Sequence, residues 1–171
     1  MTAESIRNSL ETAIGFLKEN PDFARIKNPP ATAVLESGLK FRVESPKGEI
    51  IITDMAPEVG GEGSATSPGW YMRVALATCD ATVMAMKAAR EGIELNALEV
   101  TVDYESDARG TLGIGDSVHP GPLDMSVKVR IGADGVPEEK LRDVVKWAEA
   151  HSPVADAICR AISYSTEVKI I

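Results

Sequence analysis

The stretch from Ser67 to Gly92 constrains the fold most, because it reads as one long helix that is apolar on more than one face. It starts at Ser67-Pro68, an N-cap followed by proline at the first helical position, where no intrahelical partner exists for the amide. Six side chains recur every three or four residues along one face: Met72, Leu76, Cys79, Val83, Met86 and Arg90. Alanines occupy the other faces, as is typical of a central helix that is largely buried. The chain is therefore expected to fold around this helix.

This apolar helix is not expected to cross a membrane. The stretch from Val74 to Ala89 is interrupted by Asp80 and Lys87 and is shorter than the roughly 20 apolar residues that a membrane span requires. The N-terminus lacks the basic start and the apolar run of an export signal. We therefore expect a cytoplasmic protein without a membrane partner, whose two cysteines stay reduced.

The segments on either side of the helix carry alternating helix and strand patterns. The predicted helices cover residues 3–19, 68–92, 137–150 and 154–161. The predicted strands cover residues 31–35, 39–43, 49–53, 95–104, 123–131 and 164–171, and the first three form an antiparallel meander. Between the meander and the helix, residues 54–67 form a glycine-rich loop. Because the strands are grouped before and after one central helix, the pattern favours an α+β fold.

Charge and histidine content exclude several classes of function. With a formal net charge of -8 and no basic stripe, the chain repels phosphate backbones, so no nucleic acid partner is expected. The run Gly60-Gly61-Glu62-Gly63 lacks the spacing of a phosphate-binding loop, and Glu62 repels anions. His119 and His151 have no second ligand at a metal-binding spacing. We expect neither a metal nor a cofactor.

Cys79 is the residue best suited to chemistry. A thiolate attacks peroxides, acyl carbons and disulfides where a cation or a helix N-terminus favours its ionised form. Cys79 lies about three turns past the start of the helix and beside Asp80, so packing in the core as a small apolar residue is the competing interpretation. That second interpretation applies more strongly to Cys159. A hydrolase that uses Cys79 with His151 as its base requires the two side chains to meet within about 3 Å.

Four short motifs resemble the OsmC/Ohr family of osmotically inducible and organic hydroperoxide resistance proteins. They are Gly60-Gly61-Glu62-Gly63, Ser67-Pro68, Val74-Ala75-Leu76-Ala77-Thr78-Cys79 and His151-Ser152-Pro153-Val154. The resemblance covers residues 31–171 and implies an OsmC-like domain, with antiparallel sheets around the cysteine-bearing helix. Residues 1–30 then form an added N-terminal helical extension.

The resemblance also implies a partner and an activity. The family forms intertwined homodimers with the helix cysteine at the subunit interface. In its peroxidase members this cysteine reduces organic hydroperoxides under oxidative stress, in a peroxiredoxin-like reaction, and an arginine from the early strands activates it. By position, Cys79 takes the peroxidatic role and Arg42 the activating role. A thiol then restores the resulting sulfenic acid.

Two positions depart from the pattern of the peroxidase members. Ten residues before Cys79 these members carry an acid that orients the arginine, but this chain has Gly69. At the position of the resolving cysteine the chain has Ser152. Because a serine cannot form a disulfide, the resemblance implies that an external small thiol reduces the oxidised cysteine.

The same two departures favour an alternative function without catalysis. In this alternative, a dimer of the same fold holds a small apolar ligand in an interface pocket lined by Trp70, Tyr71 and Met72. Cys79 is then a residue of the pocket wall. A Cys79→Ser variant that keeps its ligand affinity distinguishes this function from the peroxidase.

Overall fold

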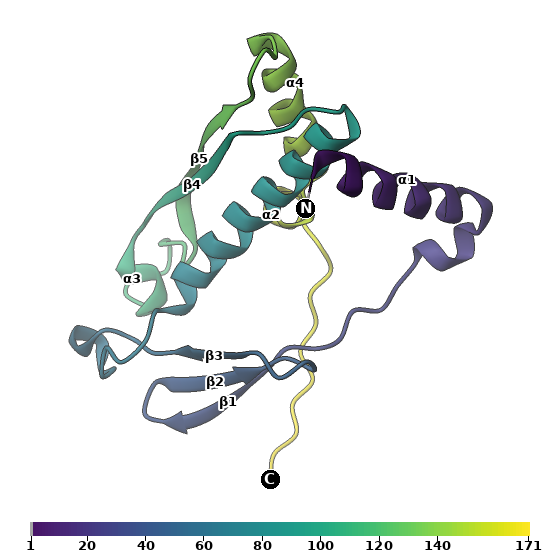
Figure 1. The fold of residues 1–171 in the computed structure, drawn as a ribbon. Helices are drawn as coiled ribbons and strands as arrows, with labels where there is room; N and C mark the ends of the chain where they lie inside the picture. The colour runs from purple at the N-terminus through teal and green to yellow at the C-terminus, as the bar shows by residue number, and fades with distance from the viewer. Residues whose placement is uncertain (1) are drawn as a thin grey trace. The chain divides into compact units, whose positions relative to one another are not determined.

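The computed structural model describes residues 2–171 (Figure 1). The helices are α1 (Ala3–Glu19), α2 (Pro68–Arg90), α3 (Ala108–Thr111), α4 (Glu138–Glu149) and α5 (Pro153–Cys159), with 3-10 turns at Pro21–Ala24 and Pro57–Val59. The strands are β1 (Thr32–Ser37), β2 (Lys40–Glu44), β3 (Ile50–Thr53), β4 (Ala97–Ser106) and β5 (Pro122–Gly132). Helices and antiparallel sheets together confirm the α+β class predicted from the sequence.

The chain forms two compact units. One is Ser9–Ala75, and the other joins Leu76–Ile171 to the start of α1 up to Asn8. Both α1 and α2 therefore contribute residues to both units. The sequence predicted a different boundary, after residue 30, and that boundary stays a prediction.

The unit Ser9–Ala75 contains the predicted meander. Its strands pair antiparallel in the order β1-β2-β3, so β2 lies in the middle. Arg42 on β2 pairs with Val34 on one side and with Ile52 on the other. The turn between β1 and β2 contains Gly38, whose φ of 51° is a left-handed conformation that glycine adopts without steric penalty. Arg42 is therefore fixed at the centre of this sheet.

The hydrophobic core lies in the unit that contains Leu76–Ile171. α2 and α4 pack their apolar stripes against each other and against one face of the β4-β5 hairpin (Figure 1). The buried core side chains are Met84, Ala88, Ile93, Leu141, Val144 and Ala148. This packing explains why α2 is a helix: its apolar residues recur at helical spacing and meet a complementary helix and sheet face.

The buried stripe of α2 differs from the predicted one by one position. The sequence placed Cys79 on the apolar face, but the stripe that is buried runs through Leu76, Asp80 and Met84, at a spacing of four residues. Cys79 is half-buried, and Asp80 is 5% exposed. The periodicity fixed the helix but did not decide which of two adjacent residues faces the core, since consecutive residues are about 100° apart on a helix.

The predicted last strand is wrong in the isolated chain. Residues 161–171, all of which the structure describes, have no regular secondary structure. Their alternating pattern is strand-like, but β4 and β5 pair with each other, and a strand needs a neighbour to satisfy its backbone hydrogen bonds. The segment between β4 and β5 contains the short helix α3, which Asp107 caps by accepting a hydrogen bond from the Arg109 amide.

Among residues 2–171, none of the helices is long and apolar enough to cross a membrane. Within the same range, histidine, cysteine, aspartate and glutamate side chains form no group of three placed to hold a metal ion.

Candidate active site

Cys79 and Ser152 are in direct contact although 73 residues separate them in the sequence. The Ser152 hydroxyl donates a hydrogen bond to the Cys79 sulfur, with an Oγ–Sγ distance of 3.3 Å. Ser152 is 1% exposed, whereas Cys79 is half-buried and so reachable from outside. Both residues belong to the same unit. The thiol is thus held by a buried polar neighbour while one side of it stays open.

Ser152 is fixed in place because it caps α5. Its hydroxyl oxygen accepts a hydrogen bond from the Ala155 amide at 3.4 Å, and Pro153 follows at the first helical position. A hydroxyl has one proton to donate, and the cap uses only an acceptor site. The single proton of Ser152 therefore points to the Cys79 sulfur. The local sequence Ser152-Pro153 thus orients a donor toward the thiol.

The glycine-rich loop before α2 is organised by a buried carboxylate, Asp54, which is 1% exposed. One oxygen accepts from the Met55 amide at 2.7 Å, and the other accepts from the amide and the hydroxyl of Ser64, both at 2.9 Å, and from the Glu62 amide at 3.2 Å. The loop also packs tightly at Gly61, where a Cβ atom would lie 1.9 Å from the Met55 carbonyl oxygen. The loop that leads into α2 is therefore held in a defined conformation by the Asp54 carboxylate and by close packing at Gly61.

These hydrogen bonds lower the pKa of Asp54. The Ser64 amide contributes most, burial acts in the opposite direction, and the Ser64 hydroxyl and the Met55 and Glu62 amides add to the lowering. Because the pKa in the folded chain is below the usual 3.8, the Asp54 carboxylate stabilises the folded state fully above that pH. The stabilisation is lost as the pH falls through the lowered folded-state pKa.

We expect an Asp54→Asn variant to show this pH dependence directly. At about pH 6 its thermal midpoint should lie several degrees below that of the parent protein, because an amide cannot accept all of these hydrogen bonds. The difference should shrink as the pH falls below 3.8 and through the lowered folded-state pKa of Asp54, where the parent carboxyl gains its proton. Thermal unfolding followed by circular dichroism measures it. The control is Asp22→Asn, at an exposed residue, which should leave the thermal midpoint unchanged. A difference in midpoint between Asp54→Asn and the parent protein that stays constant with pH would contradict this role of Asp54.

Arg42 and Arg160 are both engaged with carboxylates. Arg42 forms an ion pair with Glu44 on its own strand, with an Nη2–Oε2 distance of 3.0 Å. Arg160, at the end of α5, pairs with Asp156 at 2.7 Å and holds the pKa of that carboxyl below its usual value. Arg42 and Cys79 belong to different units, so an activating role of Arg42 stays a prediction.

The structure places His151 against Trp147. The two rings are stacked with centroids 3.8 Å apart, and the His151 Nδ1 lies 2.7 Å from the Trp147 carbonyl oxygen. This imidazole is thus engaged at the end of α4, whereas the side chain that meets Cys79 is the adjacent Ser152. Cys159 is exposed, not packed in the core as the sequence suggested.

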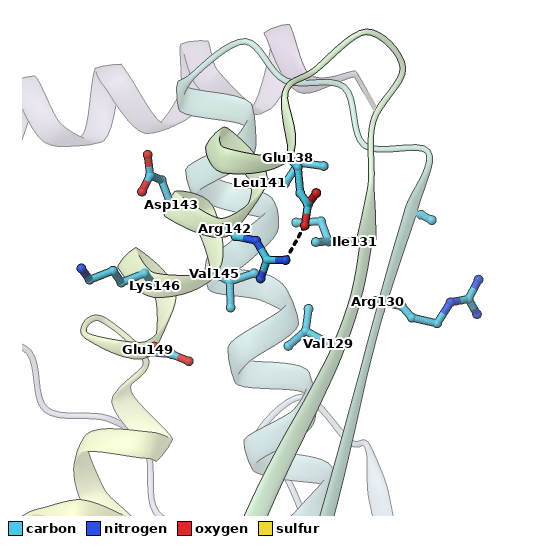
Figure 2. A pocket seen from close by; sticks show the side chains of 11 residues that line it. Val129, Arg130, Ile131, Glu138, Leu141, Arg142, Asp143, Val145, Lys146 and Glu149 are labelled. Atoms are coloured by element: carbon cyan, nitrogen blue, oxygen red, sulfur yellow. Dashed lines mark hydrogen bonds and ion pairs between the residues drawn. The ribbon is translucent and has the colours of Figure 1, made fainter.

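A groove of about 750 Å³ lies between α4 and β5, away from Cys79 (Figure 2). Apolar side chains such as Val129, Ile131 and Val145 line its interior, and an ion pair joins Glu138 to Arg142 along α4. The lining also includes Glu149, near the end of that helix. This groove was not predicted from the sequence, because it depends on how two distant elements pack.

Comparisons with known proteins place this fold among characterised structures. The sequence model of the family described as "OsmC-like protein" matches residues 61–167. An OsmC-like protein from Mycoplasma pneumoniae has a TM-score of 0.66 at 18% identity, with 79% of this chain and 89% of that chain covered. An organic hydroperoxide resistance protein from Legionella pneumophila has a TM-score of 0.56 at 21% identity, with 78% and 91% covered. No curated protein sequence matches the chain.

A third similar structure is an organic hydroperoxide resistance protein of Bacillus subtilis, with a TM-score of 0.50 at 18% identity. It covers 75% of this chain and 90% of the other. At such identities the structures establish the fold, and they confirm the OsmC-like architecture that the four sequence motifs implied.

Proposed function

The chain belongs to the OsmC-like protein family, and from this premise we propose that it is a thiol peroxidase in which Cys79 reduces small organic hydroperoxides. The observation that carries the proposal is the contact between Cys79 and Ser152. Cys79 is a half-buried thiol whose sulfur accepts a hydrogen bond from a buried hydroxyl. Such a hydrogen bond orients the sulfur, and the exposed part of the side chain leaves room for a substrate. Neither cysteine forms a disulfide in the structure, so both are available as thiols.

The proposed reaction begins with the Cys79 thiolate. Its sulfur attacks the terminal oxygen of the hydroperoxide, the O–O bond breaks, and the alkoxide takes up a proton and leaves as an alcohol. Cys79 becomes a sulfenic acid. An external thiol then attacks the sulfur and releases water, and a second thiol breaks the mixed disulfide and restores Cys79. Ser152 cannot take part as a resolving residue, so both reducing equivalents come from outside the chain.

Arg42 is the proposed activating cation. An arginine near the thiol favours the thiolate and attracts the peroxide oxygens. Its present partner is Glu44, a half-exposed residue on the same strand, and an exposed ion pair of this kind exchanges partners at little cost in free energy. Gly69 has no carboxylate to orient an arginine, and the carboxylate that contacts Arg42 in the structure is that of Glu44.

We also propose that the protein acts as an intertwined homodimer. Large apolar side chains are exposed on the meander and in the C-terminal tail, residues 161–171. Examples are Val34 at 58%, Ile50 at 50% and Ile170 at 87%. Exposed apolar surface on this scale is typical of a face that a partner covers. In the tail, Tyr164, Val168 and Ile170 alternate with polar residues, which suits a strand added to a partner's sheet.

The tail provides a matched test of the dimer. We expect the double variant Val168→Asp/Ile170→Asp to be monomeric at micromolar concentration, because two charges on the apolar face oppose burial. The variant Glu167→Gln/Lys169→Gln changes the other face and should stay dimeric. Sedimentation velocity gives the molecular mass in each case, and equal masses for both variants would contradict a role of the tail in assembly.

A binding function without catalysis is the second candidate. The observation in its favour is the start of α2, where Trp70 is 43% and Met72 36% exposed and the Trp70 ring meets Tyr71 edge to face at 5.2 Å. Exposed aromatic side chains of this kind are suited to an apolar ligand. In this function Cys79 is a wall residue, and a Cys79→Ser variant keeps its affinity for the ligand.

Hydroperoxide consumption tests the proposed reaction. Purified protein, tert-butyl hydroperoxide and a small thiol in excess are combined, and the remaining hydroperoxide is measured over time. The rate should rise in proportion to the protein concentration and should depend on the thiol. A rate no higher than that of the thiol alone contradicts the peroxidase and leaves the binding function as the better account.

A further inference from the structure

Asp80 is a buried carboxylate in the core-facing stripe of α2. It is 5% exposed, and its Oδ1 atom is buried and has no hydrogen-bond partner among the described residues. Removing a carboxylate oxygen from water without a partner is unfavourable, and buried polar atoms in folded proteins are nearly always paired. The described residues therefore provide no hydrogen-bond donor for this buried oxygen of Asp80.

Asp80 lines a cavity of about 270 Å³ between α2, β5 and α5, which we call the Asp80 cavity. Most of its lining is apolar: Leu76, Met84, Met125, Val127, Val129, Ala155 and Ile158. The polar side chains of the lining are Asp80, Glu149 and the thiol of Cys159. Its size is near the lower limit of roughly 300 Å³ for small-molecule sites.

The charges of this lining define the ligand that fits. Two carboxylates line the cavity, those of Asp80 and Glu149, and none of the lining residues is lysine, arginine or histidine. A ligand must therefore donate hydrogen bonds, and a positive charge is favoured over a neutral donor. The apolar walls require that the remainder of the ligand be hydrocarbon. An anion, such as a carboxylate or a phosphate, is repelled.

Glu149 is a second carboxylate in the lining of this cavity. It is exposed, and it lines both the Asp80 cavity and the neighbouring groove between α4 and β5 (Figure 2). Val129 lines both as well, so the two spaces adjoin along β5. The exposed Glu149 carboxylate therefore adds a second negative charge to the lining of the Asp80 cavity, and this charge attracts a cation.

We propose that the Asp80 cavity binds a small primary ammonium compound with an apolar body. The ammonium group donates to the Asp80 carboxylate, and the apolar body packs between Met84 on α2 and Met125 on β5. The site is separate from the thiol chemistry, because Cys79 does not line the cavity although it precedes Asp80 in the chain. Its occupancy satisfies the carboxylate that the fold leaves without a partner.

Methionine-methyl NMR with benzylamine as the probe tests this site. The methyl signals of Met84 and Met125 should shift on titration, whereas those of Met55 and Met72, outside the cavity, should not. Benzoate, which has the opposite charge, should cause no shift, and benzyl alcohol should bind at least about tenfold more weakly than benzylamine. Unchanged Met84 and Met125 signals at millimolar benzylamine overturn the proposal.

Two variants make the test specific to Asp80. Asp80→Asn keeps the shape and should weaken benzylamine binding at least about tenfold, whereas Asp143→Asn, on an exposed residue of α4 outside the cavity, should leave it unchanged. Met125→Trp fills the cavity with Asp80 intact and should abolish binding even if Asp80→Asn fails to fold. Equal affinities of the parent protein and Met125→Trp overturn the proposal.

Discussion

Replacing Cys79 by serine should lower the rate of organic hydroperoxide reduction by at least about 10³-fold. A serine hydroxyl is not ionised near neutral pH, and its oxygen cannot be oxidised by a peroxide as sulfur can. The substitution changes one atom at a half-buried position, so the fold should persist. The measurement is the thiol-dependent consumption of tert-butyl hydroperoxide, with circular dichroism to verify the fold.

Cys159→Ser is the matched control for this prediction. Cys159 is exposed at the end of α5, and the reaction assigns it no step, so the variant should keep the parent rate within about twofold. If Cys79→Ser retained the parent rate, or if Cys159→Ser lost it, the assignment of the nucleophile would be wrong.

Ser152→Cys should turn the one-cysteine reaction into a two-cysteine reaction. The Ser152 oxygen lies 3.3 Å from the Cys79 sulfur, and a sulfur in its place needs to approach to about 2.05 Å to form a disulfide. After oxidation of Cys79 to a sulfenic acid, the neighbouring thiol should attack it, with loss of water, before any dissolved thiol does. The lifetime of the sulfenic acid should fall at least about tenfold, because a group held in contact has a high effective concentration.

Ser152→Ala is the control for this gain of function. It removes the hydroxyl that donates to Cys79 and caps α5 but supplies no thiol, so its sulfenic acid should persist as in the parent protein. Peptide mapping under non-reducing conditions measures the outcome. The absence of a disulfide between residues 79 and 152 in oxidised Ser152→Cys protein would contradict the geometry of the site.

The sequence predicted the elements whose patterns are local. The helix at residues 68–92 and the meander of three strands were both predicted close to their observed bounds, because capping, turn residues and side-chain spacing act within a few positions. The strand predicted at residues 164–171 is absent, since a strand depends on a partner that its own sequence does not specify. Local alternation thus indicates the capacity for a strand and not the strand itself.

The site shows the same division between local and distant information. The helix and its cysteine were predictable, but the contact between Cys79 and Ser152 joins elements that only tertiary packing brings together. Asp80 was missed as a buried residue because it was considered only as a neighbour of the thiol. Its spacing of four from Leu76 and from Met84 is the signal that indicates burial.

The central claim is that Cys79 reacts with a hydroperoxide, and mass spectrometry of the oxidised protein tests it most directly. Reduced protein is treated with one equivalent of tert-butyl hydroperoxide in the presence of dimedone, which traps sulfenic acids, and is then digested and mapped. The account predicts a dimedone adduct on the peptide that contains Cys79, and its replacement by a mixed disulfide when a small thiol is added instead. A Cys79 thiol that remains unmodified while the hydroperoxide persists would contradict it.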